Sequence, residues 1–178
     1  MKVALDYRIR VDDAVLDSST LLGSLDKYRD ALVKAGTIEG AIVLKLDNES
    51  HAGDYFDPIL RLGGQWIRKL PWILGGDTET VAFRDSEHCF GFVPAGDSVE
   101  LSFFQGPESE VEEYIVEPST VRLDAFAKES IRLCERLVEL VKAVNPSLLE
   151  TDDDCRELVA SLDEGRNAWR DYQLHNRR

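Results

Sequence analysis

The chain has 178 residues, 43% of them hydrophobic, and its 34 acidic against 21 basic side chains give a formal net charge of −13. The apolar content excludes a disordered chain, and the negative charge disfavours nucleic acid and anionic membrane surfaces as partners. Three cysteines, an odd number without Cys-x-x-Cys spacing, favour a reducing, cytoplasmic location over a disulfide framework. The length predicts one domain over residues 1–178.

The first third of the chain alternates between strand and helix patterns. Residues 3–11 alternate apolar and polar side chains, which predicts a half-buried strand. Leucines then recur at helical spacing, which predicts a helix that is capped by Ser18 or Ser19 and stops at Gly36. Residues 38–46 are rich in β-branched and aliphatic side chains and predict a second strand.

A second helix is expected after a polar loop over residues 47–53. Asp57 is a preferred N-cap residue, and Pro58 suits the first helical position because no hydrogen bond is lost there. Apolar side chains then recur at helical spacing, but Pro71 removes a backbone donor and predicts a kink or break. The pair Gly75-Gly76 is expected to end the helix.

The second half predicts a run of strands and then two helices. Residues 79–117 hold four short apolar runs whose connections are too short for parallel crossovers, which predicts an antiparallel meander. One helix is expected from Asp124 to Asn145-Pro146, and another after a capping box at Thr151-x-x-Asp154. The order β-α-β-α-β-β-β-β-α-α predicts an α+β fold, a mostly antiparallel sheet packed against helices.

No catalytic motif accompanies these elements, so no catalytic residue and no cofactor are predicted, and a non-enzymatic role is favoured. His88 and Cys89 are neighbours in a predicted strand and therefore point to opposite faces, which argues against a nucleophile–base pair. No metal site is predicted either. The alternative is the set His51, Asp54 and Asp57, whose imidazole and carboxylate groups suit a divalent ion.

A long acidic stretch lies between Gln105 and Pro118, with five glutamates and no Lys or Arg. The alternation of Glu110 and Glu112 with Val111 predicts a solvated strand face. If that strand is a sheet edge, its charges protect it against aggregation; alternatively, they attract a basic partner protein. The candidate protein-binding residues are therefore four glutamates and one tryptophan beyond the expected break at Pro71, namely Glu108, Glu110, Glu112, Glu113 and Trp72.

Several short apolar segments carry a resemblance in layout: Asp57-Pro58-Ile59-Leu60 through Gly76, Val81-Ala82-Phe83, Phe90-Gly91-Phe92 and Val99-Glu100-Leu101. With the acidic composition, they resemble small acidic bacterial proteins of immunity type. Some of those proteins neutralise a toxin domain. The resemblance implies a non-enzymatic binder and assigns no residue a role.

The sequence thus predicts a protein-binding module that masks a basic toxin or nuclease surface. The alternative is a small enzyme or ligand-binding protein with a pocket near the glycine-rich helix over residues 57–76. A monomer and a homodimer paired through the C-terminal helices are both compatible with the sequence.

Overall fold

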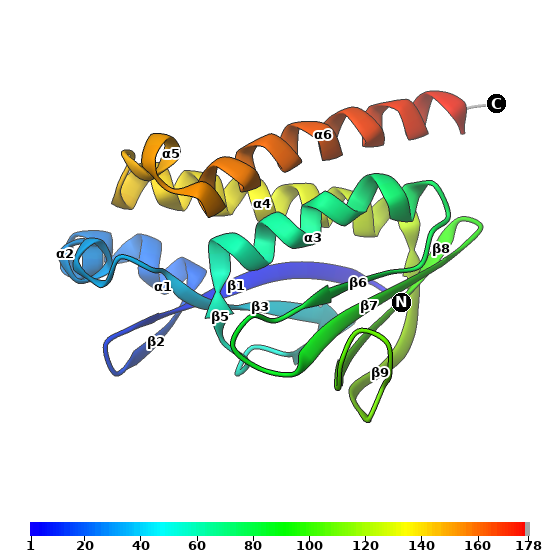
Figure 1. Ribbon diagram of the computed structural model, residues 1–178, viewed down its shortest axis with the longest axis horizontal. Helices are drawn as coiled ribbons and strands as arrows, with labels where there is room; N and C mark the ends of the chain where they lie inside the picture. Colours follow the sequence, from blue (N-terminus) through cyan, green and yellow to red (C-terminus); the bar gives the residue numbers. More distant parts are fainter. Residues whose placement is uncertain (177–178) are drawn as a thin grey trace.

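The computed structural model describes residues 1–176, whose strands form two antiparallel sheets on one side of a helical layer (Figure 1). The first sheet has the order β2-β1-β3-β4, with β5 also paired to β3, and consists of β1 (Val3–Val11), β2 (Ala14–Asp17), β3 (Glu39–Leu46), β4 (Glu49–His51) and β5 (Asp57–Pro58). The second is a meander in chain order, β6 (Glu79–Ala82), β7 (His88–Ala95), β8 (Ser98–Gln105) and β9 (Glu113–Arg122). The predicted α+β class is confirmed, with the strands divided between two sheets.

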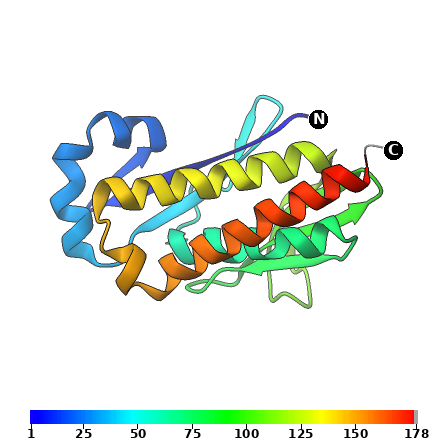
Figure 2. The same cartoon turned by 90° about the horizontal axis from the view of Figure 1, so that it is seen from above.

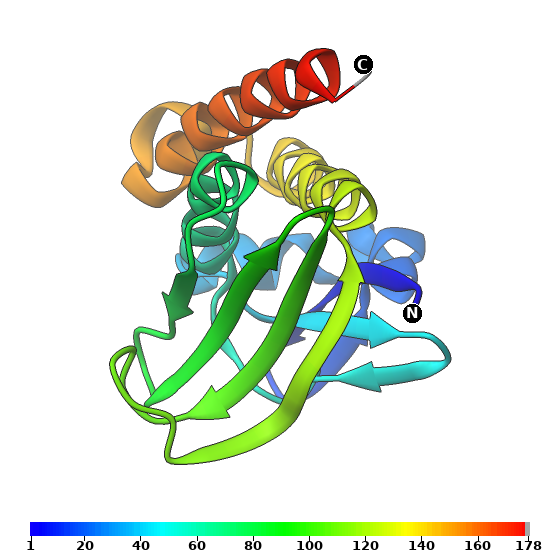
Figure 3. The same ribbon diagram turned by 90° about the vertical axis from the view of Figure 1, so that its right-hand side faces the viewer.

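The helices are α1 (Ser18–Gly23), α2 (Leu25–Ala35), α3 (Ile59–Leu74), α4 (Leu123–Val144), α5 (Leu148–Thr151) and α6 (Asp153–His175). Seen from above, α3, α4 and α6 run alongside one another, and α1 and α2 lie at one end of the molecule (Figure 2). Figure 3 shows that α3 and α4 lie on the sheets and that α6 lies outside them. Within residues 1–176, no helix is both long enough and apolar enough to cross a membrane.

Glycines let α3 approach its neighbours closely. A Cβ atom added at Gly63 would lie 2.6 Å from Cδ1 of Leu137, so the Leu137 side chain of α4 packs directly against the backbone of α3. Gly64 faces α6, where an added Cβ atom would lie 3.5 Å from the backbone of Leu158. The glycine pair lowers the intrinsic stability of α3 but brings three helices into direct contact.

Trp66 joins α3 to α4 and to β7. Its side chain is buried, and the indole Nε1 donates a hydrogen bond of 2.9 Å to Oγ of Ser130 in α4. The ring meets Phe90 and Phe92 edge-on, with centroids 4.9 and 4.8 Å away. Its one polar atom is therefore satisfied in the middle of the apolar core, where aromatic pairs favour this edge-on geometry.

Two hairpin turns add strands that the sequence pattern did not reveal. Asp12 and Asp47 take positive φ angles of 51° and 52° in two-residue connections, a conformation that Asp tolerates better than most residues. β2 follows the first turn and β4 the second, so the predicted polar loop over residues 47–53 is wrong in part. The first helix is also divided at Ser24, and Asp17 rather than a serine precedes it.

Asp57 does not cap α3, contrary to the prediction. Residues 57–58 pair with β3, and the buried Asp57 carboxylate accepts backbone hydrogen bonds from Arg84 (3.1 Å) and Asp85 (3.0 Å). The Arg61 guanidinium lies 3.6 Å from the same carboxylate. Asp57 therefore fastens the turn after β6 to the start of α3, a tertiary role that no local spacing encodes.

Pro71 does not break α3, which continues to Leu74 and ends at Gly75 as predicted. Pro71 lies in the last turn, where the Gly75 N–H closes the helix on the Pro71 carbonyl at 3.1 Å. One missing backbone hydrogen bond at this position is offset by tertiary packing of the helix.

The caps of the last two helices also differ from the prediction. α4 begins one residue before Asp124, whose carboxylate binds Arg122 at 2.9 Å. The N-cap of α6 is Asp152, whose carboxylate accepts the Cys155 N–H at 2.8 Å, whereas Thr151 ends α5. An N-cap side chain accepts a hydrogen bond from a backbone N–H two or three residues later, and Asp152 stands three residues before Cys155.

The two neighbouring glycines of α3 provide a matched test of its close packing. Gly64→Ala should leave the free energy of unfolding unchanged or raise it by up to about 1 kcal/mol, because alanine favours the helix and meets only ordinary contacts. Gly63→Ala should lower it by about 1–3 kcal/mol, because the buried Leu137 would have to move. Chemical denaturation followed by circular dichroism measures both. Equal stability of the two variants would contradict the proposed α3–α4 contact.

Candidate functional site

β9 is the outer strand of the second sheet. Among residues 1–176 it pairs with β8 alone, so the backbone groups on its other edge have no strand partner (Figure 3). The predicted strand over residues 111–116 is displaced: β9 starts at Glu113, and the turn before it is closed by the Glu112 N–H donating to the Gln105 carbonyl at 3.0 Å. Three of the glutamates therefore lie in a loop, namely Glu108, Glu110 and Glu112.

Residues 108–117, termed the acidic segment below, carry negative charge that nothing nearby neutralises. Its five glutamates are all exposed, and within the described part of the chain none forms an ion pair with Lys, Arg or His. Of these five, only Glu108 has a side-chain hydrogen-bond partner in residues 1–176, accepting a hydrogen bond of 3.0 Å from the Thr80 hydroxyl. Acids elsewhere are commonly paired, as Glu135 is with Arg166 at 3.0 Å.

Apolar side chains are exposed among these glutamates. Val111, Tyr114 and Ile115 are 39%, 39% and 36% exposed, and all three belong to the acidic segment. Aromatic and aliphatic groups beside charged ones, on a strand edge with free backbone groups, give a surface two ways to hold another protein. The segment therefore has the features of a protein-interaction surface.

Features of an edge protected against aggregation are present as well. Pro118 lies in β9, where it cannot donate a backbone hydrogen bond, and the β8–β9 register shifts on both sides of Phe103. Bulges, proline and charge on an outer strand all hinder uncontrolled pairing between sheets. These features limit regular backbone pairing to short stretches, but the exposed side chains remain accessible to a partner.

Trp72, the fifth predicted contact residue, is 58% exposed in the last turn of α3. It belongs to the helical layer, whereas the acidic segment belongs to the outer strand of the second sheet and the loop before it. The two therefore come from different layers of the fold.

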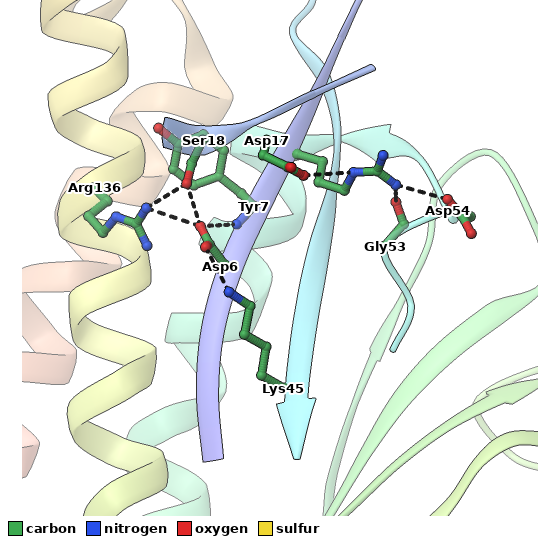
Figure 4. A network of polar contacts seen from close by, with 9 residues as sticks. Asp6, Tyr7, Asp17, Ser18, Lys45, Gly53, Asp54 and Arg136 are labelled. Atoms are coloured by element: carbon green, nitrogen blue, oxygen red, sulfur yellow. Dashed lines mark hydrogen bonds and ion pairs between the residues drawn. The ribbon is translucent and has the colours of Figure 1, made fainter. Parts of the chain in front are cut away.

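A polar hollow that the sequence analysis missed lies on the first sheet, with a volume of about 420 Å³. Figure 4 shows the polar contacts of several residues that line it, among them Asp6, Asp17 and Asp54. Arg8 of β1 reaches across it, with its guanidinium 2.9 Å from the Asp54 carboxylate, 3.0 Å from the Gly53 carbonyl and 3.2 Å from the Asp17 carboxylate. The Arg8 charge in this hollow is thus neutralised by carboxylates of the protein itself. The lining residues come from β1, β2, α1, β3, β4 and the loop after β4, and strand pairing brings these elements together, so spacing along the chain gave no signal.

Asp6 is the centre of a neighbouring network at the edge of β1. Its carboxylate accepts hydrogen bonds from the Ser18 hydroxyl (2.6 Å) and the Tyr7 N–H (2.8 Å), and it pairs with Arg136 (3.0 Å) and Lys45 (3.2 Å). Burial by itself would raise the pKa of Asp6, but these four donors outweigh it and hold the pKa below its usual value. The network fastens α1 and α4 to the first sheet.

The alternative metal ligands have other partners. His51 lies 3.7 Å from Glu49, Asp54 binds Arg8, and Asp57 is buried against the turn after β6. Within residues 1–176, no group of three His, Cys, Asp or Glu side chains is arranged to hold a metal ion.

Two further observations bear on enzymatic chemistry. Burial raises the pKa of the Cys89 thiol to about 11, and the neighbouring His88 binds Ser86 at 2.8 Å. A thiol with so high a pKa is a poor nucleophile at neutral pH. A hollow lies between Pro58 and Asp154 at the start of α3, the helix that was expected to adjoin a ligand pocket. Its volume is about 30 Å³, which is the size of a water site and far below that of a substrate pocket.

Comparison with known proteins finds no family model, no curated protein and no solved structure that matches this chain. The function of the acidic segment is therefore inferred from its geometry and charge.

The Asp6 network predicts a specific pH dependence of stability. Because the pKa of folded Asp6 lies below the unfolded value of 3.8, its ionised form stabilises the fold above that pH, and this contribution is lost as the pH falls through the folded pKa. Asp6→Asn should lower the free energy of unfolding by about 1–3 kcal/mol at pH 7, and the difference from wild type should shrink below about pH 4.

Denaturation from pH 7 to pH 3 measures this, with Asp13→Asn as the control because Asp13 is exposed in a turn. A difference that is the same at pH 3 and pH 7 would show that Asp6 does not stabilise the fold through its charge.

Proposed function

We propose that this protein is a non-enzymatic binding module that holds a positively charged partner protein through the acidic segment. The observation that supports this most is the combination, on β9 and the loop before it, of five unneutralised glutamates with exposed Val111, Tyr114 and Ile115. Charge attracts and orients the partner, and the apolar groups lose water when it docks.

In salt solution, exposed charges act on a docked partner mainly over short distances. Exposed charges are screened over about 10 Å at 0.1 M salt, so the rest of the net charge of −13 contributes mainly to the approach of a partner. Within the docked complex, the groups that act are those of the acidic segment itself. Each exposed ion pair contributes about 0.2–1 kcal/mol, so several pairs together provide a meaningful share of an affinity.

The partner class that fits is a basic toxin or nuclease surface, masked in the manner of an immunity protein. Such surfaces carry Lys and Arg to bind phosphate groups, and an acidic protein that covers them blocks that contact. The three cysteines are unpaired and buried, which supports a reducing, cytoplasmic setting for this proposal.

Removal of charge from the acidic segment tests the proposal with cytochrome c as a basic protein probe. The triple variant Glu110→Gln, Glu112→Gln and Glu113→Gln should weaken its binding about tenfold at low salt, from three pairs of about 0.5 kcal/mol each. The matched control Asp30→Asn, Glu150→Gln and Glu164→Gln removes the same charge from exposed sites on the helices and should weaken binding less than about twofold.

Isothermal titration calorimetry at two salt concentrations measures both variants. Equal losses in the two variants would show a diffuse attraction without a site, and an affinity independent of salt would exclude recognition by charge.

A further inference from the structure

A groove separates the free edge of β9 from the β3–β4 hairpin. It has a volume of about 480 Å³, and its walls include Ile115, Val116 and Glu117 on one side and Asp47 and Glu49 on the other. Figure 3 shows β9 passing beside the hairpin, each belonging to a different sheet. The groove, termed the edge groove below, thus continues the acidic segment toward the first sheet.

Both walls of the edge groove are outer strands. In the described chain β4 pairs with β3 alone, as β9 does with β8, so each has backbone N–H and C=O groups without a strand partner. An extended chain presents backbone donors and acceptors along both of its own edges, and it can pair with such a strand. The shape and the backbone chemistry therefore favour an extended segment over a globular surface or a small molecule.

The charge of the groove lining indicates which kind of extended segment it binds. The lining includes three carboxylates, those of Asp47, Glu49 and Glu117, and no Lys or Arg among the described residues. Asp47 accepts the Lys2 N–H at 2.8 Å, Glu49 lies 3.7 Å from His51, and Glu117 has no ion-pair partner in residues 1–176. Ile115, 36% exposed, adds an apolar contact.

We infer that the edge groove docks an extended segment of the partner that carries lysine or arginine, an inference that rests on the proposed function and names the part of the partner that is recognised. The backbone of that segment pairs with an outer strand, and its cationic side chains meet Glu49 and Glu117 on opposite walls. Alternation of side chains along a strand leaves the intervening residues free to face Ile115 or solvent.

A ten-residue peptide of alternating lysine and threonine, blocked at both ends, is the probe. The groove variant Glu49→Gln with Glu117→Gln should weaken its binding at least fivefold in calorimetry. The matched helix variant Glu150→Gln with Glu164→Gln also removes two exposed glutamates, from α5 and α6, and should weaken it less than twofold. Circular dichroism confirms that each variant is folded.

A second form of the peptide, N-methylated at every residue, keeps its charge but lacks backbone N–H donors on both of its edges. It should bind at least threefold more weakly than the first form. Equal binding of the two peptides would show that no strand pairing takes place.

If the helix variant loses as much peptide affinity as the groove variant, the edge groove is not the docking site. That result leaves the proposed function intact, because the proposed function is tested with other glutamates and with another probe. The proposed function fails separately, when the triple variant and its control lose the same affinity for cytochrome c.

Discussion

The close approach of α3 to α4 and α6 is the constraint on which the rest of the structure depends. Gly63 and Gly64 remove side chains from two neighbouring positions of α3, and Gly165 does the same on α6, where an added Cβ would lie 3.0 Å from Ile67. With the backbones this close, α3 buries apolar groups toward both sheets and both helices. The sheets are thereby held on one side of the helical layer, with their outer strands β4 and β9 beside each other.

Charge is distributed unevenly over this scaffold, and the contrast supports the functional proposal. Around the first sheet, Asp6 and Arg8 have partners of opposite charge within the protein, so the polar hollow there is internally neutralised. At the outer strand of the second sheet the glutamates have none among the described residues. Charges that stabilise a fold are those with partners, whereas charges without them are available to another molecule.

Protection of the edge and binding of a partner are compatible in one strand. Glutamates, Pro118 and two irregularities in register hinder pairing with a second copy, because like charges repel and the proline offers no donor. A cationic segment meets attraction at the same place. The acidic edge thus selects by charge which chains it admits, and this is a common way in which specificity is built.

Local periodicity in the sequence determined β1, β3, the meander, α4 and most of α6, because apolar side chains repeat there with the period of the element. The acidic composition of residues 108–117 follows directly from the sequence, whereas the choice of Trp72 depended on a break at Pro71 that α3 does not have. Tertiary structure alone decided the division into two sheets, the start of β9 at Glu113, the bond of Asp57 to the turn after β6 and the groove beside β4. These features depend on which distant strands pair and in what register, and that choice follows from packing the whole core rather than from any short run of residues.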